Sequence, residues 1–423
     1  MEDTTATIDH ATCLACGCLC DDIRVTVESG RVVEAANACR IGRPWFLATR
    51  PGQGHPAASI EGRPATLEEA ISRAAAILRE ARSPVLSGLS GTTIESAGAA
   101  LAIADRLGAT VDLAGSEGGA AGLAAFERVG LVSATLGEVK DRADLVVFWR
   151  VDPLTTHPRH FERYSVDPPG RFLPEGRAGR FVVVVDDRPT PSGEVADLFV
   201  RIDSDREAEA LEILRAAVRG VAIDPDRASR ASGVAFATLV TLADRLKAAR
   251  YGAIFAGDSA DRRAAENLAR LVRDLNEGRR FVALGLGGPG NLVGASAVLG
   301  WQAGAPSSVD YGRGHPRYLP GEATLADRLE AGEVDALLIV ADDPPDLPAS
   351  LPTIWIAPGA TASDRPATVA IDVARPGLEA RGTVARVDGV MLPLRPSLAT
   401  DLPTDREVLD RLRFALGDHG YKE

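Results

Sequence analysis

The chain has no cysteine beyond Cys39, although it runs to residue 423. It is also poor in lysine, because Lys140, Lys247 and Lys422 are the only lysines among its 47 basic residues. No apolar run approaches the roughly 20 residues that a membrane-spanning helix needs. The net charge of −12 argues against a nucleic-acid surface, which needs clustered cations to bind phosphates. These absences exclude a membrane-spanning protein and a nucleic-acid-binding protein.

Several common motifs of enzymes are missing as well. No G-x-G-x-x-G opens the first strand–helix unit, there is no P-loop, and no Ser-His-Asp or Cys-His order stands out. Hydrophobic residues make up 45% of the chain and charged residues 25%, which is ordinary globular composition. A chain of this length is expected to form two or three domains. Residues 1–6 are polar and acidic rather than a signal peptide, so we expect a cytoplasmic protein.

The chain concentrates its thiols in one cluster near its beginning. All five cysteines lie there, at Cys13, Cys16, Cys18, Cys20 and Cys39. The subset Cys13, Cys16, Cys20 and Cys39 has the C-x2-C-x3-C…C spacing of an iron–sulfur ligand set. A [4Fe–4S] cluster takes four thiolates, one for each iron. The spacing therefore predicts that these four residues bind a metal centre.

The residues alone leave the occupant of this site open. Zinc also accepts four thiolates, and closely spaced cysteine pairs are common in zinc sites. Disulfides fit poorly, because no export signal precedes the cysteines. An empty site, which has lost its metal, is the third alternative.

The segment between the third and the last cysteine of this set is predicted to be a β-hairpin. Residues 23–27 alternate between apolar and polar side chains, residues 28–30 read as a turn, and residues 31–34 return as a second strand. A hairpin at this place would bring Cys39 back to the other three cysteines.

The rest of the chain alternates between predicted strands and helices. A capping box at 66–69 begins a helix that runs to Ala81, and another helix is predicted at 94–107. Strands at 84–86 and 109–113 flank this second helix, which has the crossover length of a parallel sheet. More apolar strands follow at 144–149, 181–186, 198–202, 252–256, 281–284 and 336–340. Near-continuous apolar strands imply sheets that are covered on both faces.

We therefore predict an α/β protein with open, largely parallel sheets covered by helices, plus a small amino-terminal cysteine-rich β module. The predicted domains are the cysteine-rich module at 1–60, a discontinuous α/β domain at 61–170 plus 300–423, and an inserted α/β domain at 171–299. Ligands on sheets of this kind bind in the loops at the carboxyl ends of the strands.

Four segments in predicted loops each have a functional and a structural interpretation. Gly287–Asn291 could cradle a phosphate or a pterin with backbone N–H groups, or be a tight turn. His157–His160 is better explained as a loop with hydrogen-bonded rings than as a metal site, because Pro158 hinders the helix that two metal-binding histidines would need. Arg313–Tyr318 could bind an anion or a partner's carboxylate, or be a surface loop. Asp342–Asp346 is typical of a proline-stiffened acidic turn rather than of a cation site.

Several stretches match one family in order along the chain, at residues 13–23, 37–42, 157–165, 291–295, 300–304, 313–318, 377–383 and 386–390. The stretch at 157–165, HPRHFERYS, matches the family's HPRH-x-x-RYS pattern. Over about residues 10–395 the chain resembles the B subunit of formylmethanofuran dehydrogenase, within the molybdopterin oxidoreductase superfamily. The resemblance implies the fold of that superfamily.

The resemblance also locates the site where the family binds its metal. The family's catalytic subunit carries tungsten or molybdenum on two pyranopterins, with a cysteine or selenocysteine as the protein ligand. By spacing, the ligand position falls on Gly118 and its usual polar neighbour on Gly119. The family's Gly-x-Asn-Pro turn, which approaches the pterin, is changed to Arg150–Pro153. A soft thiolate is the expected ligand of such a metal, so the resemblance implies a degenerate site without molybdopterin, tungstopterin or a catalytic residue.

A chain that has lost this ligand resembles the B subunit of the formyltransferase/hydrolase complex of methylotrophic bacteria. That complex moves a formyl group from tetrahydromethanopterin to a methanofuran-type carrier and hydrolyses it to formate, in the one-carbon metabolism of formaldehyde oxidation. We therefore predict a non-redox scaffold subunit with the A, C and D subunits as partners. If the carrier's path passes this subunit, Arg313–Tyr318 is predicted to line it. The alternatives are a true dehydrogenase subunit and an electron-transfer subunit that uses the cluster alone.

Overall fold

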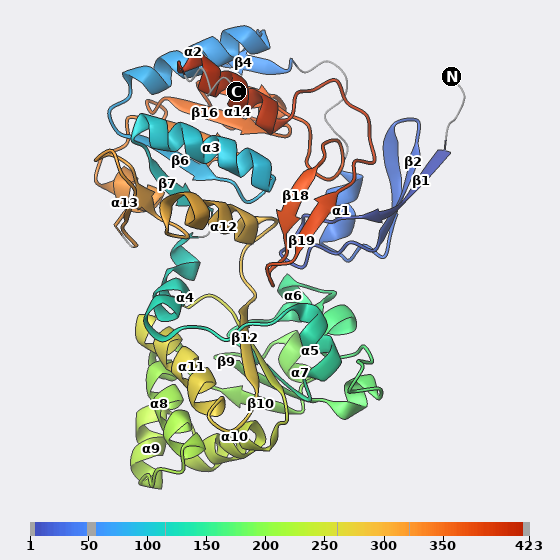
Figure 1. The fold of residues 1–423 in the computed structure, drawn as a ribbon, viewed down its shortest axis with the longest axis vertical. Coiled ribbons are helices and arrows are strands. Elements are labelled where there is room, and N and C mark those ends of the chain that lie inside the picture. The colour runs from blue at the N-terminus through green and yellow to red at the C-terminus, as the bar shows by residue number, and fades with distance from the viewer. Residues whose placement is uncertain (1–4, 49–55, 115, 260, 321, 418–423) are drawn as a thin grey trace. The chain divides into compact units, whose positions relative to one another are not determined.

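The computed structural model describes residues 5–48, 56–114, 116–259, 261–320 and 322–417. Contacts between residues divide the chain into two compact units, both drawn in Figure 1. Unit 1 comprises residues 1–116 and 288–423, and unit 2 comprises residues 117–287. In the described part of the chain, no helix is long and apolar enough to cross a membrane.

The cysteine-rich module begins with a three-stranded antiparallel sheet in the order β1-β2-β3. Its strands are β1 (Thr5–Ala11), β2 (Ile23–Glu28) and β3 (Arg31–Ala36). Ser29 and Gly30 have positive φ angles of +48° and +74°, as a tight two-residue hairpin turn requires. The predicted hairpin is confirmed, and it places Cys39 just before the short helix α1 (Gly42–Leu47).

A nine-stranded sheet forms the centre of unit 1, in the order β14-β13-β7-β6-β15-β16-β17-β4-β5. The strands are β4 (Ala58–Ile60), β5 (Arg63–Ala65), β6 (Pro84–Gly88), β7 (Thr110–Leu113), β13 (Val309–Asp310), β14 (Arg317–Tyr318), β15 (Ala336–Val340), β16 (Thr353–Ala357) and β17 (Val369–Asp372). The run from β7 to β17 is parallel. Because β7 and β15 lie on opposite sides of β6, the strand order reverses between β6 and β15.

Helices cover one face of this sheet, as Figure 1 shows. They are α2 (Leu67–Glu80), α3 (Ile94–Leu107), α12 (Leu292–Ala303) and α14 (Asp405–Ala415). Their apolar residues pack on Leu86 and Ile354 of the sheet. On the other face, α13 (Leu325–Glu330) and nearby loops pack on Trp355, and the 3-10 turn η4 (Ala360–Ala362) follows β16. A separate hairpin, β18 (Gly382–Ala385) with β19 (Met391–Leu394), completes unit 1.

Unit 2 is built on a five-stranded parallel sheet in the order β10-β9-β8-β11-β12. Its strands are β8 (Leu145–Trp149), β9 (Phe181–Asp186), β10 (Leu198–Arg201), β11 (Gly252–Ala256) and β12 (Phe281–Gly285). The strand order reverses between β8 and β11, because β9 lies on the other side of β8. Reversals of this kind are where open α/β sheets bind ligands.

Helices on one face of this sheet bury Val147 and Ile254. They are α8 (Glu207–Val218), α10 (Phe236–Ala248) and α11 (Arg262–Leu275). On the other face, Phe161 stacks on Phe148 with a ring-centroid distance of 4.9 Å. The remaining elements from residue 116 onward are α4 (Ser116–Val129), α5 (Leu136–Arg142), α6 (Pro153–Thr156), the π-helix η1 (Phe161–Ser165), η2 (Gly176–Gly179), α7 (Pro191–Glu194), η3 (Ser204–Arg206) and α9 (Pro225–Ser232).

The predicted α/β class is confirmed, and each predicted strand occurs within two residues of its expected bounds. The inserted part of the chain has different limits from those predicted. Unit 2 covers 117–287, whereas the sequence suggested 171–299. The difference arises because β8 pairs with β9 and β11, which draws residues 117–170 into the five-stranded unit. The cysteine-rich module is counted with unit 1.

Candidate functional site

The cysteine loop, residues 13–20, is closed by backbone hydrogen bonds. The Cys13 N–H donates to the Cys20 carbonyl oxygen at 2.9 Å, and the Leu19 N–H donates to the Cys16 carbonyl oxygen at 3.2 Å. Leu19 has a φ of +41°, the left-handed conformation that such a tight loop needs. These bonds hold the ends of the loop together.

The four cysteines of the predicted ligand set lie close together. A Cβ atom at position 42 would lie 2.9 Å from the Cys13 Sγ and 3.8 Å from the Cys39 Sγ, so glycine at this position leaves room for both sulfur atoms. Burial raises the pKa of Cys13, and the nearby thiols of Cys20, Cys16 and Cys39 raise it further. Cys13 is therefore within electrostatic range of the other three.

The fifth cysteine has a different role in this cluster. The pKa of Cys16 is lowered mainly by a hydrogen bond from Cys18, and the same bond and burial raise the pKa of Cys18 well above its usual range. Cys18 thus holds its proton more tightly than Cys16 does. The spacing leaves Cys18 out of the predicted ligand set.

The donor set contains the four sulfur atoms that a [4Fe–4S] cluster needs. No disulfide joins any of the five cysteines. Within the described ranges, no group of three or more His, Cys, Asp or Glu side chains is placed to hold a metal ion. A single zinc ion would hold all its sulfur ligands at about 2.3 Å, whereas a cluster binds each thiolate through a different iron. The sulfur atoms match a cluster in number, and zinc also accepts four thiolates.

The predicted degenerate pterin site lies at the beginning of α4. Gly118 and Gly119 fall in its first two turns, and glycine has no side chain to coordinate a metal. Since no cysteine follows Cys39 anywhere in the sequence, no other residue can supply the soft thiolate that tungsten or molybdenum is expected to need. The residues of this chain do not fit the metal–pterin group of the family.

Arg150 directly follows the carboxyl end of β8, next to the point where the strand order of the five-stranded sheet reverses. Its φ is +55°, a conformation that glycine adopts more readily. The Arg150 Nε donates to the Glu207 Oε2 at 3.0 Å, and the Arg150 Nη1 lies 3.6 Å from the Asp187 Oδ2. A Cβ atom at position 257 would clash with the Arg150 carbonyl oxygen, so the loops after β8 and β11 are in contact. The backbones of the two loops therefore meet at this point of the crevice that a reversal of strand order forms.

In the nine-stranded sheet, a carboxylate joins the two loops at the point where the strand order reverses. Asp342, just after β15, accepts a hydrogen bond from the Ser90 N–H at 2.7 Å and another from the Ser90 hydroxyl. A Cβ atom at position 91 would clash with the Ala341 carbonyl oxygen, so the loops after β6 and β15 also touch. The acidic segment 342–346 is thus a structural connection at Asp342, in agreement with the predicted turn.

The two histidines of the HPRH segment are buried and only half hydrogen-bonded. His157 Nδ1 lies 2.9 Å from the Thr156 hydroxyl and His160 Nδ1 lies 2.9 Å from the Ser165 hydroxyl, whereas both Nε2 atoms lack a hydrogen-bond partner among the described residues. The prediction of hydrogen-bonded rings therefore holds for one nitrogen of each. Burial lowers the pKa of His157 to about 4 and that of His160 to about 3, so both rings are neutral at pH 7.

Part of the Arg313–Tyr318 segment is exposed to solvent, and part of it makes contacts within the protein. Arg313 and His315 are exposed. Arg317 is half-buried and its Nη2 lies 3.1 Å from the Asp310 Oδ1, in the β13–β14 hairpin. Arg317 thus has an intramolecular partner, which supports the surface-loop interpretation more than an anion site. Gly287–Asn291, at the unit boundary, contributes Asn291, whose side chain donates to the Thr92 carbonyl oxygen at 2.9 Å.

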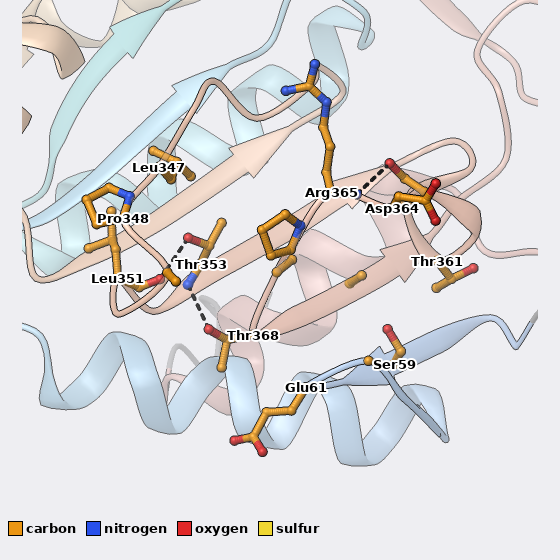
Figure 2. A pocket seen from close by; sticks show the side chains of 17 residues that line it. Ser59, Glu61, Leu347, Pro348, Leu351, Thr353, Thr361, Asp364, Arg365 and Thr368 are labelled. Carbon is orange, nitrogen blue, oxygen red and sulfur yellow. Dashed lines mark hydrogen bonds between the residues drawn. The ribbon is translucent and has the colours of Figure 1, made fainter.

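A hollow of about 470 Å³ lies beside β16 and β17, and Figure 2 shows the side chains that line it. Its polar groups largely serve the fold: the Thr353 N–H donates to the Thr368 hydroxyl at 3.1 Å, and the Arg365 N–H donates to the Ser363 hydroxyl at 3.2 Å. Arg365 also donates through its side chain to the Pro344 carbonyl oxygen. The Thr361 hydroxyl, which also lines the hollow, has no hydrogen-bond partner among the described residues, but a single unpaired hydroxyl is less than the few convergent polar groups that mark a specific ligand site.

Sequence analysis did not identify the residues whose hydrogen-bond partners lie far away in the chain. Glu207, the partner of Arg150, is 57 residues away, and Ser90 is 252 residues from Asp342. Neither pair has a local sequence signal. The one sign in the sequence was Arg150, which stands where the family has a turn glycine. A buried arginine needs a carboxylate near it, so this residue pointed to a distant acidic partner.

The fold defines the class of protein. The structure of acetylene hydratase from Pelobacter acetylenicus aligns with a TM-score of 0.66 at 11% identity, over 97% of this chain and 69% of that one. This is the fold of molybdopterin-type enzymes. No family model matches the chain.

Sequence comparison then gives the family. The B subunits of tungsten-containing formylmethanofuran dehydrogenase 2 from Methanocaldococcus jannaschii and Methanococcus maripaludis are each 34% identical to it, over 95% of this chain and 97% of theirs. The chain belongs to the B-subunit family of formylmethanofuran dehydrogenase.

A third relative belongs to a different complex. The B subunit of the formyltransferase/hydrolase complex Fhc of Methylorubrum extorquens is 31% identical over 69% of this chain and 76% of its own length. The crystal structure of that FhcABCD complex with methylofuran contains a chain that aligns with a TM-score of 0.71 at 30% identity, over 86% of this chain and all of that one. The predicted resemblance is confirmed.

Proposed function

We propose that this chain is the B subunit of a formyltransferase/hydrolase complex and that it has no redox or catalytic site of its own. One observation carries the proposal: the chain has no thiol beyond Cys39 and has glycine at position 118, although it belongs to a family with tungsten-containing members. The arginine at the end of β8 adds support, because its side chain is paired with Glu207 and its backbone meets the loop after β11 at the crevice there.

By this proposal the partners are the A, C and D subunits, and the carrier is of the methanofuran type. The related Fhc complex has four kinds of subunit and was crystallised with methylofuran. The complex would transfer a formyl group from tetrahydromethanopterin to the carrier and then hydrolyse it to formate. Neither step changes the oxidation state of the one-carbon unit, so a B subunit without a metal–pterin group is compatible with turnover.

We also propose that Cys13, Cys16, Cys20 and Cys39 bind a [4Fe–4S] cluster that serves structure. Such a cluster transfers single electrons where a redox partner is present. This chain has no second cysteine set to receive an electron, which argues against an electron-transfer subunit. The buried surroundings of Cys13 and Cys20 and the spacing of the thiols favour the cluster over zinc.

Elemental analysis of the whole complex, purified without oxygen, tests the proposal. We expect about four irons for each copy of this chain, no stoichiometric tungsten or molybdenum, and formyl hydrolysis by the same preparation. Stoichiometric tungsten or molybdenum would overturn the argument from Gly118. A preparation without iron would remove the cluster from the proposal and leave the scaffold role.

A second candidate function is that of a true dehydrogenase subunit. The 34% identity to tungsten-containing subunits over nearly the full length of both chains favours it. A dye-linked assay of formate or formyl-carrier oxidation distinguishes the two functions. We expect no dye reduction by a complex that hydrolyses the formyl carrier.

A further inference from the structure

The cysteine loop is held from outside by a turn that lies far away in the sequence. The turn, residues 386–390, connects β18 to β19. The Val387 N–H donates to the Gly17 carbonyl oxygen at 3.0 Å. Gly17 lies between Cys16 and Cys18, so this bond fixes the middle of the loop that carries three of the four predicted ligands.

The turn itself is made rigid by a buried ion pair. The Arg386 Nε and Nη2 donate to the two carboxylate oxygens of Asp388 at 2.8 and 2.7 Å. The side chains are 11% and 0% exposed. Bidentate pairs between a guanidinium and a carboxylate combine charge with a fixed geometry. The Gly389 N–H donates to the Arg386 carbonyl oxygen at 2.7 Å, and the Arg386 N–H donates to the Val390 carbonyl oxygen at 3.0 Å.

Apolar packing connects the same hairpin to the same loop. Leu14 and Leu19 of the loop form one buried cluster with Val384, Leu392 and Leu394 of β18 and β19. Leu19 is fully buried and Leu14 is 6% exposed. The hairpin therefore covers both ends of the loop, and the turn contacts its centre.

We propose that Arg386 is a positioning residue for the metal group of the cysteine loop. It does not coordinate the metal. It holds the turn at residues 386–390 in the shape that fixes Gly17. The inference rests on the proposed occupation of Cys13, Cys16, Cys20 and Cys39. Residues that support metal ligands in this way typically change metal affinity by about 10- to 100-fold when they are replaced.

The test compares Arg386→Met with the matched control Arg395→Met in the whole complex, purified without oxygen. Arg395 is exposed and lies on the same hairpin, just past β19. The readout is the rate at which a ferrous chelator, bipyridine, removes iron, together with the electron paramagnetic resonance spectrum of the reduced cluster. We expect Arg386→Met to lose iron about tenfold faster than the wild type and to change the spectrum, and Arg395→Met to match the wild type.

Iron loss from Arg386→Met at the wild-type rate would overturn the inference, and so would an equal effect of Arg395→Met. Arg386→Lys keeps the charge but lacks the planar fork, so we expect an intermediate rate; it also replaces Arg386→Met if that variant fails to assemble. A wild-type complex without iron, before and after anaerobic loading with iron and sulfide, overturns the inference but leaves the formyl hydrolysis of the proposed function intact. Stoichiometric tungsten or molybdenum would instead overturn the proposed function.

Discussion

Both units bury carboxyl groups, but among the described residues only unit 2 also buries imidazoles. In unit 1, Asp405 is fully buried beside Thr92 and Ser96, and burial raises its pKa; burial also raises the pKa of Asp342. In unit 2, burial lowers the pKa values of His157 and His160. Both units have parallel sheets with a reversal of strand order, so the contrast comes from the side chains and not from the architecture.

The contrast predicts opposite responses to acid. A raised carboxyl pKa means that the folded state holds its proton more tightly, so its contribution to stability is present at low pH and is lost as the pH rises through the folded pKa. A lowered histidine pKa means the reverse: the contribution is present above the unfolded value of 6.5 and is lost as the pH falls. Acid therefore favours Asp342 and Asp405 of unit 1 and disfavours His157 and His160 of unit 2.

The largest expected effect comes from breaking the buried ion pair of unit 2. Arg150→Met leaves the Glu207 carboxylate 8% exposed without its cation, which costs about 4 kcal/mol. Amide hydrogen exchange of peptides from β8 and β9 measures the loss in unit 2 by itself. Arg201→Met, whose side chain is 68% exposed, is the control and should change stability by less than about 0.5 kcal/mol. Adding Glu207→Gln should recover most of the loss; no recovery would mean that the charge is not the cause.

The next effect is the loss of unit 2 stability in acid. Between pH 6.5 and pH 4 the unfolded chain gains a proton on His157, whose folded pKa is about 4, and this costs about 3 kcal/mol by pH 4. Exchange of β11 amides at several pH values measures it. His157→Asn should remove the part of the pH dependence that His157 contributes and leave that of His160, whereas His315→Asn, at an exposed position of unit 1, should leave the whole pH dependence unchanged. A slope in His157→Asn equal to that of the wild type would assign the acid response to other groups.

A smaller effect is expected where the loops after β6 and β15 of the nine-stranded sheet meet. Asp342→Ala leaves the Ser90 N–H and hydroxyl without their acceptor, which costs about 2 kcal/mol. The neighbouring Asp343 is exposed, so Asp343→Ala has the same change of charge without the buried bonds. Exchange of β6 and β15 amides compares the two. Equal protection of these amides in Asp342→Ala and Asp343→Ala would contradict the role of Asp342 in joining the loops after β6 and β15.

The smallest expected effect is a change of the stability of unit 1 with pH, opposite in sign to the effect of the histidines in unit 2. Because the pKa of Asp342 is raised from 3.8, unit 1 should lose a little stability as the pH rises from about that value. Asp342→Asn should abolish this part of the pH dependence, as measured by exchange of β16 amides. A steeper loss in acid for the wild type than for Asp342→Asn would reverse the assigned sign.

The parallel strands could be predicted because each is a continuous apolar run between turn residues, as in Phe181–Asp186. The cysteine ligand set stays a prediction from its spacing. The hairpin β18–β19 could not, because Pro393 interrupts β19 and prolines are poor strand signals. Arg386 has no local feature that connects it to the cysteine loop. Its role arises from packing between segments more than 360 residues apart, such as Val387 and Gly17.

The strand order of unit 1 also has a consequence for synthesis. β6 and β7 are translated before unit 2, but β15, which covers the other edge of β6, is complete only at residue 340. At typical translation rates the ribosome needs on the order of tens of seconds for that interval. During this time the contiguous unit 2 can fold, whereas Leu86 and its neighbours on β6 wait without their partner strand. A nascent chain arrested before β15 should therefore bind chaperones through its first half.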